Sequence, residues 1–509
     1  MRRIRERPRV GARYISTRLA FHAINVIAGR ESSDEMTRTA QLAAFVSRTG
    51  FDDIPEPVRT ASKRIILDTI GCAIGALATE VGTETVAAAA AQGKGNATIL
   101  GAREKVSPAA AAYANGRLGN ILDIDECYMI QGHHAQAALG AALAIAEERK
   151  LSGAELIAAF AVGFEIGIRL GYYFTPRVPV STDGKALGWT GLVGPSQGVH
   201  AALASVSNLL HTAPEKIAHG LGMAPQYSVH RAWSPQWGKQ LDLGTIKYAD
   251  TGWNAQGGLV AALSAAHGVT GIADIFDTDA YQNVFPEAVF TPAALTDGLG
   301  QVWNVQNTSI KFWPCCRWIH YALTAFDIVM RDQQLSCDDI EHVQLRSFPL
   351  IRYPRFSDGS DPSNLVAATF SFHHAAAMVA LGVPPGPEWF TAENMSGDAA
   401  RAMRAKIELI HDPLGDDPGN WGQENRELKV PSSVVVHAKG QTFEQRSDYA
   451  KGDPWSGAPE ITEHDYVAKF TILAAAAGMA PEAMEALVGA VLNLETVGDV
   501  GDMLALTRI

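Results

Sequence analysis

Segments with helical spacing, dense in alanine and glycine, fill the first 300 residues and constrain the fold more than any other feature of this chain. Between residues 55 and 77 apolar side chains recur every three or four positions, and Pro55 and Pro57 suit the first turn of a helix. Residues 152–155 and 212–215 have the form of capping boxes. Further helices are predicted over 86–92, 135–149, 156–170 and 217–223, and a short strand over 96–100. Because small residues let helices pack closely, we expect a compact helical domain.

The pattern changes at residue 309, where apolar and polar side chains begin to alternate. Val343 and Leu345 alternate with Gln344 and Arg346, which is typical of a half-buried strand. Strands are predicted over 342–347, 406–411, 434–438 and 442–446, the last two forming a hairpin, with helices over 372–381 and 398–404 and a lid-like loop over 412–428. We therefore expect an α+β domain over residues 309–455. Helices resume after a variant capping box at 462–465, with one over 481–493.

The first 35 residues differ from the rest of the chain. Seven arginines lie among the first 18 residues, and acids are few until Glu31. Targeting presequences share this composition, but a clear apolar core and a small-residue cleavage site are missing. We interpret residues 1–35 as a disordered N-terminal extension and leave the presequence as the alternative.

The charge balance limits the partners of this chain. It has 42 Lys and Arg against 54 Asp and Glu, a net charge of −12, which argues against a nucleic-acid partner. An anionic substrate would therefore need a local group of cations. Five cysteines without a CxxC pair fit a reducing compartment, so a cytoplasmic location is predicted. No uninterrupted apolar run reaches transmembrane length, and no membrane partner is expected.

Residues 122–138 concentrate ionisable groups in an apolar neighbourhood. Asp123, Asp125 and Glu126 are followed by His133 and His134. Buried charges are costly unless they are paired, solvated or functional. The carboxylates of Asp123 and Asp125 could simply cap the helix that follows. The same residue types also bind metals, but the spacing fits no standard zinc pattern and HExxH is absent, so no metal is predicted.

An Asp-x-Asp-(Asp/Glu) motif with a histidine about ten residues later resembles the MmgE/PrpD family, whose members include 2-methylcitrate dehydratase, cis-aconitate decarboxylase and iminodisuccinate epimerase. The resemblance continues in family order from about Arg38 to Leu506. Lys247 and Gly252 match a Lys-x-x-His-x-Gly motif whose lysine lies in the active site. Residues 311–320, KFWPCCRWIH, resemble Lys-Pro-Tyr-Pro-Cys-Cys-Arg-Phe-x-His.

The resemblance implies a mainly α fold. The C-terminal helices are expected to pack back on the first ones, so that residues 36–308 and 456–509 form one large helical domain. The α+β domain, residues 309–455, would be a smaller lid inserted between these two parts. The family also implies a homodimer formed through the helical domains.

Three positions depart from the family pattern. Cys127 replaces a threonine, Asp250 replaces the histidine of the lysine motif, and Gly188 replaces a histidine by our alignment. A thiol donates hydrogen bonds weakly, and a carboxylate repels an anionic substrate. We therefore expect a substrate other than methylcitrate or cis-aconitate.

These observations predict a cofactor-free lyase that dehydrates or decarboxylates a small di- or tricarboxylate. An epimerase on the same site and a non-catalytic carboxylate-binding protein are the alternatives. His133 is expected to transfer the proton, with Asp123 orienting it or serving as a second base. Lys311→Ala should mainly weaken substrate binding. The predicted catalytic residues are Asp123, His133, Lys247 and Lys311, and the predicted substrate-binding residues are Cys127, Arg317 and His320. A hinge whose cations pair only with protein acids is the alternative for Lys311 and Arg317.

Overall fold

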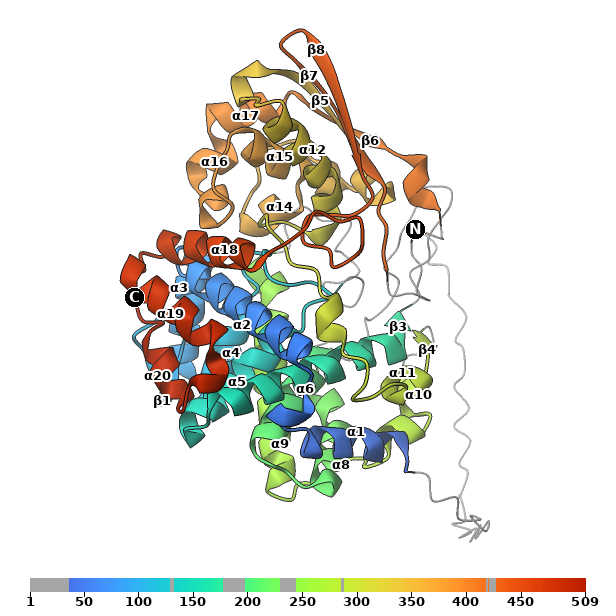
Figure 1. Ribbon diagram of the computed structural model, residues 1–509, viewed down its shortest axis with the longest axis vertical. Coiled ribbons are helices and arrows are strands. Elements are labelled where there is room, and N and C mark those ends of the chain that lie inside the picture. The colour runs from blue at the N-terminus through green and yellow to red at the C-terminus, as the bar shows by residue number, and fades with distance from the viewer. Residues whose placement is uncertain are drawn as a thin grey trace, which may run out of the picture. The chain divides into compact units, whose positions relative to one another are not determined.

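The computed structural model describes residues 36–128, 132–176, 197–228, 244–284, 288–417, 420 and 427–509 (Figure 1). Residues 37–509 form one compact unit. The helices before residue 300 are α1 (Arg38–Arg48), α2 (Glu56–Ala76), α3 (Glu80–Gln92), α4 (Pro108–Leu118), α5 (Ala135–Arg149), α6 (Gly153–Tyr173), α7 (Gln197–Leu209), α8 (Pro214–Met223), α9 (Ala249–Ala266), α10 (Ala280–Val284) and α11 (Ala293–Thr296). The fold is mainly α, as predicted.

The helical core is built around α5, which packs against α4, α6, α7 and α9. Small residues bring these helices close together. A Cβ atom at Gly140 of α5 would lie 2.8 Å from the backbone nitrogen of Gly116 on α4. One at Gly163 of α6 would lie 2.6 Å from the carbonyl oxygen of Ala201 on α7. Such contacts have no room for a side chain, which explains the density of glycine and alanine in this part of the sequence.

Two small antiparallel pairs lie in this part, β1 (Lys94–Thr98) with β2 (Lys105–Val106) and β3 (Phe174–Pro176) with β4 (Ala288–Phe290). The larger sheet has the order β6-β5-β7-β8 and consists of β5 (Ile340–Ser347), β6 (Ile407–His411), β7 (Ser432–Ala438) and β8 (Gln441–Ser447). Strands β5 and β6 are parallel, whereas β7 pairs antiparallel with both β5 and β8.

Helices cover one face of this sheet (Figure 1). They are α12 (His320–Asp332), α13 (Pro354–Ser357), α14 (Leu365–Phe370), α15 (Phe372–Ala380), α16 (Ala392–Ser396) and α17 (Asp398–Arg404). Helix α12 packs on β5, β7 and β8, and α15 packs on α12 and on β6. The strands and helices expected after residue 309 are thereby confirmed, and both strands of the predicted hairpin are present.

The last helices return to the beginning of the chain. Helices α18 (Glu463–Ala476) and α19 (Pro481–Leu492) pack on α2, and α20 (Val500–Ala505) packs on α5 (Figure 1). A Cβ atom at Gly71 or Gly75 of α2 would lie 3.0 Å from the side chain of Phe470 or Leu473 on α18. This return agrees with the arrangement that the family resemblance implied. The domain boundaries at residues 308 and 455 stay a prediction.

Local signals gave mixed results. The capping boxes at Ser152 and Thr462 are present. The one predicted at 212–215 is wrong, because Pro214 occupies the first turn of α8 and the N-cap is Ala213, whose side chain accepts no hydrogen bond. Gly188, the interpretation of residues 1–35 and most of the 418–426 stretch of the predicted loop lie outside the described residues. Among the helices described, no single one is long and apolar enough to cross a membrane; only the bent pair α2 and α3 passes that test together.

Candidate functional site

The loop between α4 and α5 carries the predicted acidic motif, and distant parts of the chain hold it in place. Asp123 lies in the left-handed region with φ 50°, a conformation that Asp tolerates better than most residues. Its N–H donates to the carbonyl oxygen of Asn120 at 3.0 Å. Lys469 of α18 donates from Nζ to the carbonyl oxygen of Ile124 at 2.5 Å. Cys127 exchanges backbone hydrogen bonds with Ser309.

Two lysines neutralise the carboxylates of this loop. Lys311 Nζ lies 2.5 Å from Oδ1 of Asp123 and 3.6 Å from Oδ1 of Asp125, and Lys247 Nζ lies 3.7 Å from Oδ2 of Asp123. Burial alone would raise the pKa of Asp123, but the charges of Lys247 and Lys311 outweigh it and hold that pKa far below its usual range. Burial would lower the pKa of Lys311, yet the two carboxylates raise it. Asp123 and Lys311 are therefore both charged near neutral pH.

His133 is held in one tautomer by its neighbours. Its Nδ1 lies 2.8 Å from the carbonyl oxygen of Glu126 and 2.8 Å from Oδ2 of Asp125. Burial would raise the pKa of Asp125, but His133 and Lys311 lower it, so this carboxylate is ionised and only accepts hydrogen bonds. Because both neighbours are acceptors, Nδ1 must carry a hydrogen. In the neutral ring the nitrogen without a hydrogen is then Nε2, which lies 4.0 Å from Oδ1 of Asp123.

Exposure divides the cluster into two layers. The His133 side chain is 20% exposed and that of Lys247 is 12% exposed. Asp123 is 3% exposed, whereas Asp125 and Lys311 are completely buried. His133 and Lys247 therefore form the exposed layer of the cluster, while the other three charges lie beneath them and set their electrostatic environment.

Glu126 caps the helix that follows the motif. Its Oε1 accepts from the backbone N–H groups of His134 and Ala135, each at 2.7 Å, at the start of α5. Our sequence interpretation gave this capping role, as one alternative, to Asp123 and Asp125, and the structure assigns it to their neighbour. Burial outweighs these contacts and raises the pKa of Glu126 to about 7. The residue fixes the backbone that carries His133.

Two of the predicted substrate-binding residues, Arg317 and His320, have buried protein partners. Arg317 pairs with Asp453 and donates to the carbonyl oxygens of Ile310 and Lys451. His320 has Nε2 3.3 Å from the carbonyl oxygen of Cys315. Burial, together with the charge of Arg317, holds the pKa of His320 well below its usual value, so the ring is neutral.

The third predicted substrate-binding residue is Cys127. Burial raises the pKa of its thiol, which therefore stays protonated. The contacts described do not test a role of Arg317, His320 or Cys127 in binding substrate. Asp250 lies buried in the first turn of α9, where a negative charge is favourable.

Two contributors escaped the sequence analysis. Lys469 stands 345 positions after Ile124, the residue that it contacts, and no local pattern could connect them. Phe370 of α14 lies with its ring centroid 5.3 Å from Lys247 Nζ. Within the described part of the chain, no group of three or more His, Cys, Asp and Glu side chains is arranged to hold a metal ion. Between Asp123 and Asp125, the position that a cation would take holds the Lys311 ammonium.

Comparison with known proteins identifies the family. The pattern of the MmgE/PrpD N-terminal domain matches residues 40–292, and that of the MmgE/PrpD C-terminal domain matches residues 313–494. The chain belongs to the MmgE/PrpD family. It is 26% identical to the cis-aconitate decarboxylase-like protein oryM of Aspergillus oryzae, over 94% of this chain and 98% of that protein.

Two further relatives are named cis-aconitate decarboxylase. The one from Aspergillus terreus is 26% identical over 62% of this chain and 66% of its own length. The one from Homo sapiens is 25% identical over 91% and 92%. The family is enzymatic and decarboxylases are lyases, so this chain is an enzyme of the lyase type.

Proposed function

We propose that this chain is a cofactor-free lyase that removes CO2 from a small di- or tricarboxylate, with His133 as the acid that protonates the product carbon. The observation that carries the proposal is the pair of acceptors at His133 Nδ1, which leaves Nε2 as the proton-transferring atom at the accessible side of the cluster. The names of the relatives favour decarboxylation over dehydration.

In the proposed reaction, Lys247 binds a substrate carboxylate and His133 begins as an imidazolium. The bond between the departing carboxylate and its carbon breaks, CO2 leaves, and the electron pair remains on that carbon. The carbon takes the proton from Nε2, forming a C–H bond, and water then reprotonates the ring. Asp125 lies 2.8 Å from Nδ1 and Asp123 lies 4.0 Å from Nε2, so both carboxylates contact the ring that would transfer the proton.

The preferred substrate is expected to differ from those of the relatives. Cys127 presents a weak donor where the family has a hydroxyl, and Asp250 places a carboxylate where it has an imidazole. A dehydratase or an epimerase would use the same Nε2 as a base, so these reactions remain the alternatives that an assay must separate.

The test is turnover of a panel containing cis-aconitate, citrate, 2-methylcitrate and smaller dicarboxylates, followed by CO2 release and by proton NMR in D2O. A decarboxylase should release CO2 and place one deuterium on the carbon that lost it. His133→Gln should lower kcat about 10²- to 10⁴-fold. His437→Gln on the exposed β7–β8 hairpin, where His437 contacts Thr442, is the matched control and should not change it.

Full activity in His133→Gln would refute the assigned acid. Water loss without CO2 release would identify a dehydratase. Exchange of a substrate hydrogen for deuterium, with loss of neither CO2 nor water, would identify an epimerase. Binding of carboxylates without any turnover would favour the non-catalytic alternative.

A further inference from the structure

A second cation lies on the ring that contacts Lys247. The guanidinium carbon of Arg355, on α13, is 5.1 Å from the ring centroid of Phe370, and Lys247 Nζ is 5.3 Å from the same centroid. Because both distances end at one point, the two charged groups lie within about 10 Å of each other. Arg355 itself is buried, with 2% of its surface exposed.

The path from Arg355 to the charge cluster is built from packed elements. Helix α14, which carries Phe370, packs on α13 and on the short helix Thr245–Tyr248, which carries Lys247. The carbonyl oxygen of Thr369 accepts from the N–H of Cys316 at 2.8 Å, so the end of α14 is also tied to the segment that supplies Lys311. These contacts give Arg355 a fixed position relative to the two lysines.

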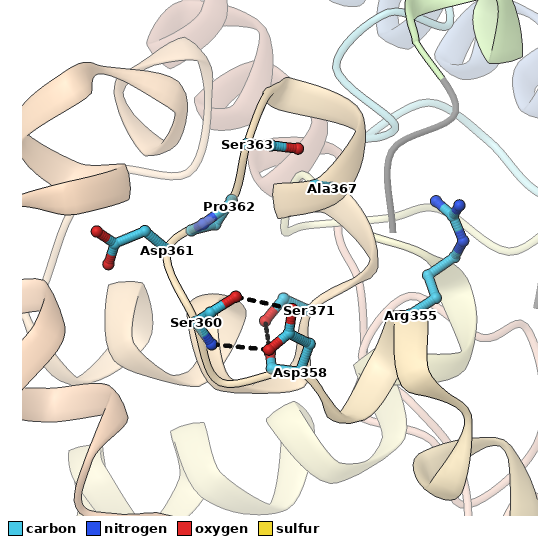
Figure 2. A pocket seen from close by; sticks show the side chains of 8 residues that line it. All are labelled: Arg355, Asp358, Ser360, Asp361, Pro362, Ser363, Ala367 and Ser371. Carbon is cyan, nitrogen blue, oxygen red and sulfur yellow. Dashed lines mark hydrogen bonds between the residues drawn. The ribbon is translucent and has the colours of Figure 1, made fainter. Parts of the chain in front are cut away.

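Arg355 also lines a pocket of the α+β part, together with Asp358, Ser360, Asp361 and Ser371 (Figure 2). Asp358 accepts from the N–H and the hydroxyl of Ser360, at 3.0 and 2.7 Å. In Figure 2 the guanidinium extends away from this hydrogen-bonded group. The Arg355 guanidinium therefore points away from the Asp358–Ser360 hydrogen bonds, and it contacts the same Phe370 ring as Lys247 does.

The cations of the central cluster are largely balanced by carboxylates of the protein. Lys247 and Lys311 are balanced by Asp123 and Asp125, and Arg317 pairs with Asp453. A di- or tricarboxylate brings two or three negative charges, and among the described residues of the cluster the exposed layer offers it Lys247 and His133. A second carboxylate requires positive charge at another point of the same site.

We propose that Arg355 binds a second carboxylate of the substrate and selects acids in which two carboxylates lie a few ångströms apart, an inference that rests on the proposed function. Because the two cations lie no more than about 10 Å apart, charge-assisted hydrogen bonds of about 2.8 Å at each end leave at most about 4 Å between the carboxylates. Carboxylates on adjacent or next-adjacent carbons of a short chain have about this separation. A planar guanidinium suits such a contact because it binds both oxygens at once.

The experiment measures binding separately from turnover. Isothermal titration calorimetry with tricarballylate, an unreactive tricarboxylate, and with butyrate, which has one carboxylate, is applied to the wild type, Arg355→Gln and Arg355→Lys. Arg352→Gln is the matched control, since Arg352 lies three positions earlier and its exposed side chain contacts His411. Thermal unfolding of each variant reports whether it is folded.

Arg355→Gln should weaken tricarballylate binding by roughly tenfold to a hundredfold and leave butyrate binding unchanged. Arg355→Lys should show an intermediate loss, because it keeps the charge but not the planar fork. Arg352→Gln should bind as the wild type does. In steady-state assays Arg355→Gln should raise KM more than it lowers kcat.

Equal loss of tricarballylate and butyrate binding in both Arg355 variants would assign Arg355 a structural role and overturn the inference. Unchanged tricarballylate affinity in Arg355→Gln, with an active wild type, would overturn it while leaving the proposed lyase intact. If the wild type binds tricarballylate but turns over no acid of the panel, and Arg355→Gln loses that binding, the Arg355 site is supported and the lyase is overturned. A wild type that does not bind tricarballylate would overturn the inference.

Discussion

Replacing Lys311 with methionine tests the most buried charge of the site. The substitution keeps an unbranched side chain of similar length and removes the ammonium that separates Asp123 from Asp125. Both carboxylates are buried, so each loses a partner that water does not replace. Removing one partner of a buried ion pair costs about 3–5 kcal/mol. Since whole domains are stable by about 5–15 kcal/mol, the free energy of unfolding should fall by a large fraction.

The same substitution should affect catalysis through the carboxylates. Without Lys311 the pKa of Asp123 and Asp125 rises, because burial is then opposed by fewer cations. Protonated carboxyls support the His133 imidazolium poorly, so kcat should fall. KM should change less than kcat, because the Lys311 ammonium is already engaged by Asp123 at 2.5 Å and by Asp125 at 3.6 Å. The loss of binding predicted for Lys311→Ala from charge attraction stays a prediction, and the kinetics of the two variants separate these expectations.

Urea unfolding and steady-state kinetics would be measured for the wild type, Lys311→Met, Asp123→Asn and the double variant. Asparagine tolerates the left-handed backbone of position 123, so the comparison isolates charge. The loss of unfolding free energy in the double variant should be smaller than the sum of the losses in the two single variants, by about 0.5–3 kcal/mol. Lys439→Met is the control, since solvent screens its surface pair with Asp339 and its loss should change stability little. Additive effects, or a Lys311→Met protein as stable as the wild type, would refute the reasoning.

Three further predictions concern the surroundings of the cluster. Because the pKa of Glu126 is raised to about 7, this group stabilises the fold below its unfolded value of 4.5 and loses that contribution as the pH rises to about 7. In urea unfolding, the free energy of unfolding of Glu126→Gln should therefore rise relative to that of the wild type, by up to about 3 kcal/mol, as the pH increases from 5 to 8. Lys469→Met should lower kcat and stability together, and adding Asp68→Asn should recover part of the stability, because Lys469 Nζ lies 2.5 Å from Asp68. Exhaustive chelation should leave turnover unchanged, whereas activity restored by one divalent metal would reassign Asp123, Asp125 and His133 as ligands.

Local patterns were sufficient for most of the secondary structure. Helices α5 and α17 have the predicted bounds, and α2 differs by one residue at each end, because apolar spacing and first-turn prolines act within a few residues. The failure at residues 212–215 has a local cause as well. Proline fixes its own backbone angle and begins α8 there, so the threonine stands one position too early to cap it.

The site was only partly predictable, because its charges meet across the chain. The resemblance indicated Asp123, His133, Lys247 and Lys311, and the structure places these four side chains in one cluster. It could not indicate which nitrogen of His133 carries the hydrogen, since that depends on the carbonyl group of Glu126 and on Asp125. The partners of Arg317 and Lys469 lie 136 and 345 positions away in sequence, and only the folded chain brings them together.

The distances around Asp123 separate a fixed ion pair from an adaptable one. Lys311 lies 2.5 Å from Oδ1, within direct hydrogen-bonding distance, whereas Lys247 lies 3.7 Å from Oδ2, beyond it. Turning Lys247 toward a substrate carboxylate therefore breaks no short hydrogen bond to Asp123, and Lys311 continues to neutralise that aspartate. The buried pair also supports the left-handed backbone of Asp123. Such a conformation costs about 1–3 kcal/mol and persists only where the surrounding structure holds it in place. Lys311 and Asp123 are thus the fixed pair of the cluster, whereas Lys247 and His133 are its partly exposed groups, and under the proposed function these two contact the substrate.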